Sequence, residues 1–126
     1  MTTRLTLDIP AAWWTSSNDR LHWAERATRT RHIRQYAALR ARAEHVPTYD
    51  VALIIARIQY PTARKADPFN AAPVIKAAVD GLVDAGVFPD DDSEHVIGPA
   101  PVRMPGKSKP GTYRVDLILT NQEVPW

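Results

Sequence analysis

The segment VALIIARIQYPTARKADPFNAAPVIKAAVDGLVDAG, residues 51–86, decides the expected fold because it holds a strand, a polar loop and an amphipathic helix in succession. Residues 51–60 are mostly apolar and rich in β-branched side chains, which is typical of a central strand. Pro73 suits the first turn of a helix. That helix is predicted to end near Gly86, and its core stripe recurs at spacings of three, four and seven residues: Ile75, Ala78, Val79 and Leu82.

The flanking sequence supplies the other elements. The alternating residues 5–9 predict a half-buried strand, and the stretch from about Trp23 to Glu44 contains no Gly or Pro and predicts a helix. Two further strands are expected over 95–104 and 113–119, joined by a flexible basic hairpin loop, PGKSKPG, over 105–111. The predicted fold is one α/β (α+β) domain over residues 1–126, a small mixed sheet with two main helices in the order β-α-β-α-β-β.

Two helices cover one face of such a sheet most economically, so the other face needs a partner, and a homodimer would supply one. The tail after about Thr120 is expected to be flexible.

Composition restricts the class of protein. The chain has 126 residues, no cysteine and 44% hydrophobic residues, which excludes a disulfide framework, a thiolate zinc site and a disordered chain. No apolar run approaches the roughly 20 residues that span a bilayer. The N-terminal MTTRLTLDIPAAWW carries an acid within its apolar stretch and is not typical of a signal peptide, so a cytoplasmic protein is expected.

Charge is distributed unevenly although the formal net charge is only +2. Residues 20–42 contain seven arginines and one acid, whereas residues 84–94 contain five acids and no base. On the first helix, Arg31, Arg34 and Arg42 lie within about 60° of one another at 100° per residue. This polarity suits a protein that binds a polyanion and a divalent cation, and two ordinary solvated surfaces remain the alternative.

The acids at the two ends of the second helix are candidate metal ligands. Magnesium prefers oxygen ligands and commonly takes one or two carboxylates together with waters and phosphate. The predicted ligands precede and follow the helix, so the loops must fold back to bring them together: Asp67, Asp90, Asp91 and Asp92. Asp67 could instead cap a turn, and the aspartate triplet could be a solvated turn.

Lys76 is predicted to project away from the apolar stripe. It could bind phosphate or stabilise negative charge in a transition state, or it could form a surface ion pair with Asp80 one turn later. The four histidines show no metal-ligand spacing. Trp13, Trp14 and Trp23 could stack on bases, although packing in the core or a dimer is favoured.

These features resemble the RusA family of Holliday-junction resolvases, homodimeric magnesium-dependent endonucleases encoded mostly by bacteriophages and prophages. The resemblance covers most of the chain and rests on short motifs in a shared order. They are an Asn-x-Arg-Leu-His-Trp turn at 18–23, an acid-x-x-Asn motif at 67–70, Lys-Ala-Ala-x-Asp-x-Leu at 76–82, and Ala-Gly, Asp-Asp and Val at 85–86, 90–91 and 96.

The resemblance implies a function and a site. It implies hydrolysis of phosphodiesters in four-way or branched DNA by a homodimer, with Mg²⁺ as the cofactor, Mn²⁺ as a substitute, and no membrane or nucleotide cofactor. Asp67, Lys76 and Asp91 match the catalytic set. The residues expected to contact DNA are Arg20, Arg31, Arg34, Arg64, Lys65, Asn70, Lys76, Lys107 and Lys109.

The chain departs from the family pattern at Phe69, where the family has its second acid. The segment between Asn70 and Lys76 is also longer than in the enterobacterial form. A phenylalanine cannot ligate a metal, so Asp80 or Asp92 would have to compensate, or two acids and more water would hold the ion. The alternative hypothesis is therefore a catalytically impaired protein that binds branched DNA and has the same fold.

Overall fold

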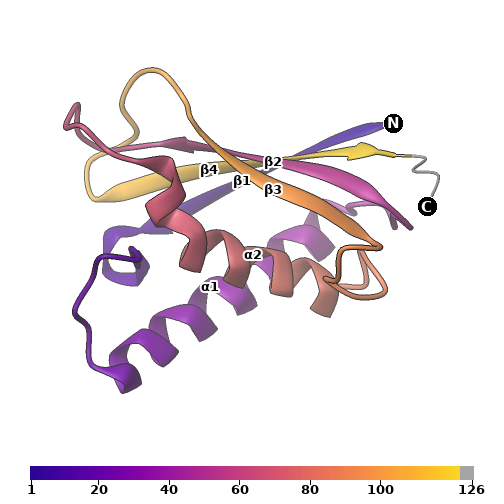
Figure 1. The fold of residues 1–126 in the computed structure, drawn as a ribbon, viewed down its shortest axis with the longest axis horizontal. Helices are drawn as coiled ribbons and strands as arrows, with labels where there is room; N and C mark the ends of the chain where they lie inside the picture. Colours follow the sequence, from indigo (N-terminus) through magenta and orange to yellow (C-terminus); the bar gives the residue numbers. More distant parts are fainter. Residues whose placement is uncertain (123–126) are drawn as a thin grey trace.

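The computed structural model describes residues 1–122, in which a sheet lies on one side and two long helices lie on the other (Figure 1). The predicted α+β class, with a mixed four-stranded sheet and two main helices, is confirmed. In chain order the elements are β1 (Thr2–Pro10), the short 3₁₀ helix η1 (Ala11–Trp13), α1 (Trp23–Ala43), β2 (Ala52–Gln59), the 3₁₀ helix η2 (Pro68–Ala71), α2 (Ala72–Asp84), β3 (Val96–Arg103) and β4 (Thr112–Asn121). Neither α1, α2 nor another described helix combines the length and apolar character needed to cross a membrane.

The strand order is β1-β4-β2-β3, which corrects the prediction of a hairpin over 105–111. β4 pairs antiparallel with both β1 and β2, while β3 pairs parallel with β2 after the crossover through α2. Pro99 and Pro101 have no N–H to donate, so β3 suits the edge of the sheet. The loop 104–111 therefore carries the chain across β2 to the interior position beside β1.

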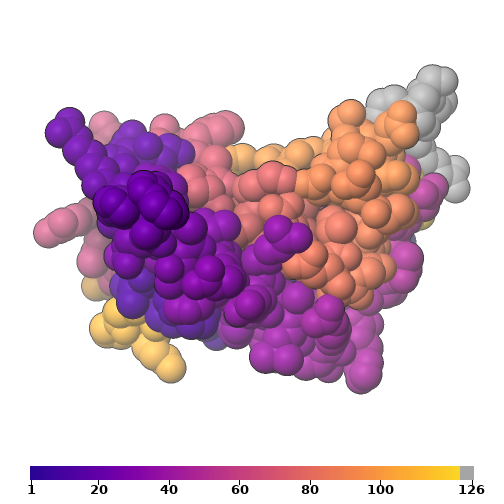
Figure 2. Space-filling view, turned by 90° about the horizontal axis from the view of Figure 1, so that it is seen from below, coloured from indigo at the N-terminus to yellow at the C-terminus, as the bar shows by residue number. Residues whose placement is uncertain are grey.

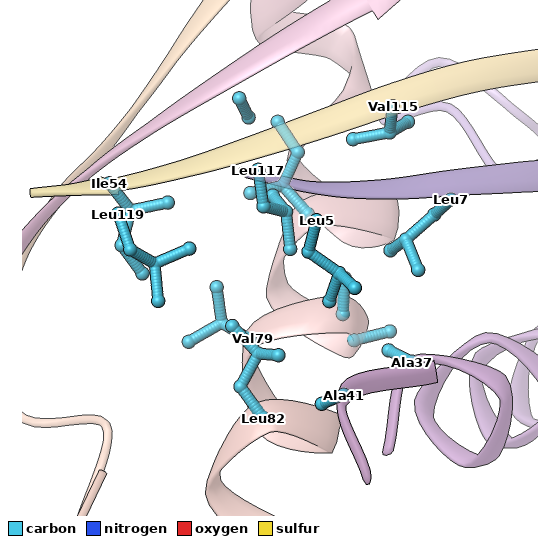
Figure 3. Packing of buried hydrophobic residues seen from close by; sticks show 14 of the residues in the cluster. Leu5, Leu7, Ala37, Ala41, Ile54, Val79, Leu82, Val115, Leu117 and Leu119 are labelled. Atoms are coloured by element: carbon cyan, nitrogen blue, oxygen red, sulfur yellow. The ribbon is translucent and has the colours of Figure 1, made fainter. Parts of the chain in front are cut away.

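The core lies between the sheet and the helices (Figure 3). Every second residue of β2, from Ala52 to Ile58, is fully buried, which is the alternation of a strand with one face on a core. In Figure 3, Val79 and Leu82 of α2 face the side chains of the sheet, and Ala37 and Ala41 of α1 lie beside them. The predicted stripe of α2 is buried as expected.

The two helices approach closely at Gly81. A Cβ at this position would lie 2.4 Å from the backbone oxygen of Arg34 and 2.8 Å from the Cβ of Ala37. The small residues on the facing side of α1, Ala37, Ala38 and Ala41, are all buried. Figure 2, seen from the helical side, shows α1 beside α2 and the segment that follows it.

The opposite face of the sheet carries no helix (Figure 1). Leu53, Ile55 and Ile118 are half-buried on it, and Ile55 pairs with Ile118. Asp116 is fully buried there, and the hydrogen bonds that its carboxylate accepts from Arg4 at 2.8 Å and from Thr6 at 2.8 Å offset the cost of burying the charge. Within the tail predicted to be flexible, β4 continues to Asn121, and the backbone N–H of Gln122 donates to the carbonyl of Val51 at 3.1 Å. Residues 123–126 lie outside the described residues.

Candidate active site on helix α2

The solvent-facing side of α2 carries a lysine between two carboxylates. Lys76 Nζ donates a hydrogen bond to Asp80 Oδ1 at 2.9 Å, so the predicted surface pair one turn apart is present. The same ammonium group also donates to Asp91 Oδ2. Lys76 is therefore the centre of a three-residue charge network rather than one half of an isolated pair.

The loop after α2 brings Asp91 to the helix. α2 ends at Asp84, and the backbone N–H of Gly86 donates to the carbonyl of Val83 as the chain leaves the helix. The hydrogen bond that Asp91 accepts from the ammonium of Lys76 is the main cause that lowers the pKa of Asp91, to about 2. The pKa of Lys76 is raised, first by Asp91 and then by Asp80. The lysine thus relieves part of the repulsion expected within the aspartate triplet.

The other two aspartates of the triplet support the loop. Asp90 Oδ1 accepts from the backbone N–H of Asp91 at 2.7 Å. Asp92 Oδ1 accepts from the backbone N–H of Glu94 at 3.0 Å. Only Asp91 of the three contacts Lys76 in the described part of the chain, which selects it as the acid associated with the lysine.

A cavity of about 390 Å³ opens beside this network between α2 and β3. Lys76 and Asp91 line it, and so does Phe69, a residue that is 68% exposed. Its remaining wall is mostly apolar: Ala72, Ile75, Val79, Val96, Gly98, Pro99 and Pro101. Phe69, where the resemblance leads one to expect an acid, therefore lines the same cavity as Lys76 and Asp91.

Asp67 occupies a different position. It is the N-cap of η2, and its Oδ1 accepts from the backbone N–H of Phe69 at 3.0 Å, which is the capping role anticipated as an alternative. It lines a second cavity, with Asn70 and Lys65, on the other side of η2. No group of three metal-ligand side chains within the described residues contains Asp67, so the structure does not bring it together with Asp90, Asp91 and Asp92.

The side chains that do cluster as metal ligands are Asp92, Glu94 and His95, whose ligand atoms lie within 4.8 Å of one another. Asp92 was among the predicted ligands, but Glu94 and His95 were not. His95 Nδ1 hydrogen-bonds to the backbone oxygen of Asp50 at 2.9 Å, and this contact, then the nearby acids, raises the pKa of His95. The signal that could have found the cluster was the spacing of the three residues within four positions.

The arginines of α1 differ in their contacts. Arg34 binds Asp84 through two hydrogen bonds of 2.6 and 2.8 Å, and Arg42 donates to the backbone oxygen of Asp84 at 3.0 Å. The carboxylate of Asp84 raises the pKa of Arg34. Arg34 thus ties α1 to the end of α2, although it was predicted to contact DNA. Arg20 and Arg31 are exposed and make no side-chain hydrogen bond or ion pair within residues 1–122.

The other cations predicted to contact DNA lie in the loops after β2 and β3: Arg64, Lys65, Lys107 and Lys109. Lys107 and Lys109 line a polar cavity of about 360 Å³ with Arg114 and Gln59. Arg64 and Lys65 are exposed in the loop before η2, and Arg103 donates to the backbone oxygen of Arg64 at 2.9 Å. In Figure 1 the loops after β2 and β3 project from the same end of the molecule.

No protein-family model matches this chain, and no curated protein matches it.

Proposed function

We propose that the chain is a magnesium-dependent endonuclease acting on Holliday junctions or other branched DNA. The observation that carries the proposal is the Lys76–Asp91 contact beside an open cavity, with Asp80 as a second carboxylate on the lysine. A cation next to ionised oxygen ligands on a concave surface suits binding and cleavage of a phosphodiester. The motif resemblance, not the geometry alone, specifies DNA as the substrate.

The donor set fits a hard divalent cation. Asp91 is ionised above about pH 2, and Asp80 lies within reach of the same lysine, so hard oxygen ligands are present. When bound, Mg²⁺ would supply an activated water and charge neutralisation. Asp91 would hold the ion, with Asp80 or Asp92 as the other carboxylate. Lys76 would turn from its carboxylate partners toward the phosphate and offset the charge that develops on its oxygens.

The DNA-binding surface in this proposal includes the exposed cations at the loop end and on α1. Lys107, Lys109 and Arg114 share one cavity, and Arg31 is exposed on α1. Such contacts recognise shape and charge rather than sequence, so binding should weaken steeply with salt. A symmetric homodimer, with its interface on the open sheet face, would place two sites for paired cuts. A cytoplasmic location is part of the same proposal.

A second candidate function is branched-DNA binding without cleavage. Two observations favour it. Phe69 puts an aromatic ring on the cavity where the family has an acid, and Asp67 caps η2 instead of joining Asp91. If two carboxylates near Lys76 cannot hold the ion, the same surface would bind a junction and leave it intact.

The test is a nicking assay on a fixed four-way DNA junction, with Mg²⁺ or with EDTA, beside linear duplex of the same sequence. Symmetric, magnesium-dependent nicks in the junction alone are expected. Salt-sensitive binding with no product in Mg²⁺ or Mn²⁺ would favour the second candidate. Absence of both binding and cleavage would reject both.

A further inference from the structure

The cavity on the far side of η2 from Lys76 has an aromatic and polar lining. It has a volume of about 190 Å³ and is lined by Trp14, Ser16, Tyr60, Lys65, Ala66, Asp67, Asn70 and Ala71. Ligand sites for drug-sized molecules occupy about 300–1,000 Å³, so this one suits a single small ring system.

The aromatic side is built from three rings. The Trp14 ring stacks on Tyr113, with centroids 3.9 Å apart and planes 5° from parallel. Tyr60 meets both rings edge-on, at 6.4 Å from Trp14 and 5.8 Å from Tyr113. Arg103 Cζ lies over the Tyr60 ring, 4.8 Å from its centroid. These contacts fix the aromatic wall before any ligand arrives.

The polar side is also held in place. The backbone N–H of Ser17 donates to the carbonyl of Asn70 at 2.9 Å, and Arg29 donates to the carbonyl of Trp14 at 2.7 Å. The side-chain amide of half-buried Asn70 makes no hydrogen bond within residues 1–122, which leaves a donor and an acceptor for a ligand. Asp67 adds a carboxylate oxygen, and exposed Lys65 adds a cation at the cavity.

We propose that this cavity binds a single unpaired nucleobase of DNA, with the ring against the Trp14–Tyr60 wall, the base edge at Asn70, and the adjoining phosphate at Lys65. An aromatic wall binds any base by stacking, and an amide can pair with a base edge through two hydrogen bonds. In branched DNA, a base beside the branch point would leave its pair to enter the cavity. This inference rests on the proposed function for its substrate, but base binding requires no cleavage.

The test is equilibrium binding in EDTA to two duplexes that differ only in one bulged 2-aminopurine nucleotide. The bulged duplex is expected to bind about tenfold tighter, because one stacked base contributes on that scale. The 2-aminopurine emission should fall as the base stacks. Equal affinities with unchanged emission would overturn the proposal, whatever the nicking assay gives.

Substitutions of Trp14 in the aromatic wall then test whether the base binds in this cavity. Trp14→Leu removes the ring and should abolish the preference for the bulge, whereas Trp14→Phe retains a ring and should keep most of it. A thermal melt of each variant checks that it is folded. The comparison of bulged and unbulged duplexes with the wild-type protein tests the proposal even if the variants do not fold. A preference unaffected in a folded Trp14→Leu protein would place the base elsewhere and overturn the proposal. Binding of free deoxyadenosine monophosphate is measured separately. If it binds as tightly as the bulged duplex, the cavity is a site for free nucleotides and the proposal is overturned.

Discussion

Lys76 and Asp91, fifteen residues apart, are joined by an ion pair that fastens the acidic loop to the outer face of α2. The pair brings one residue of the helix and one of the triplet to the same cavity. It also selects Asp91 over Asp90 and Asp92 as the acid next to the lysine. In a nuclease, the pair would have to open so that the lysine can reach a phosphate.

Asp91→Asn should abolish nicking of a four-way junction while junction binding stays the same or becomes tighter. The substitution removes the charge of the proposed metal ligand, which also repels phosphate, so catalysis and binding should change in opposite directions. Nicking and gel-shift measurements on one preparation check this. Glu25→Gln, at an exposed carboxylate of α1, is the control; wild-type cutting by Asp91→Asn would show that the site assignment is wrong.

Phe69→Asp should raise the nicking rate about tenfold or more, since it adds a carboxylate to the cavity that Lys76 and Asp91 line. Phe69→Asn is the matched control because it removes the ring without adding charge. If both variants cut at the same rate, the absence of an acid at this position does not limit activity.

Arg31→Gln should weaken junction binding and reduce the slope of log affinity against log salt by about one. Arg34→Gln should leave that slope unchanged, because its guanidinium is bound to Asp84, and should lower the free energy of unfolding by about 1 kcal/mol or less. Salt titrations and urea unfolding of both variants separate the two roles. If the slope of log affinity against log salt falls equally in the Arg31→Gln and Arg34→Gln variants, Arg34 also contacts DNA.

Gly81→Ala should lower the free energy of unfolding by about 1–3 kcal/mol, since the new methyl group would overlap the backbone of α1. Urea unfolding followed by circular dichroism measures the change. Adding Ala37→Gly should recover only part of the loss, because the backbone oxygen of Arg34 remains in the way. An unchanged unfolding midpoint would mean that the helices separate at no cost.

The pKa of His95 is raised, so its charged form contributes stability that is fully present below about pH 6.5 and is lost as the pH rises through the folded value. His95→Gln should therefore flatten the stability profile between mildly acidic and mildly basic pH. Unfolding midpoints at several pH values check this, and a profile identical to that of the unmodified chain would contradict it.

Much of the site could be anticipated because it depends on local sequence. The position of Lys76 on the outer face of α2 follows from the helical period, and its pairing with Asp80 follows from their spacing. Capping of a turn was one of the two roles predicted for Asp67 from its local sequence. By contrast, neither the partner of Arg34 nor the contact of Asp91 with Lys76 could be read from local pattern, since each joins segments that meet only after the helices pack.

The sequence by itself determined the strands, both helices and the buried stripe of α2, because each depends on periodicity and propensity within one segment. Only the tertiary structure decided the strand order, in which β4 lies between β1 and β2 rather than beside β3 in a hairpin. It also decided which acids meet. Asp67 and the triplet lie on either side of one helix in the sequence, but the fold of the loops directs Asp91 to Lys76 and leaves Asp67 at the start of η2. Pairing and loop direction depend on contacts between distant segments, which local patterns do not encode.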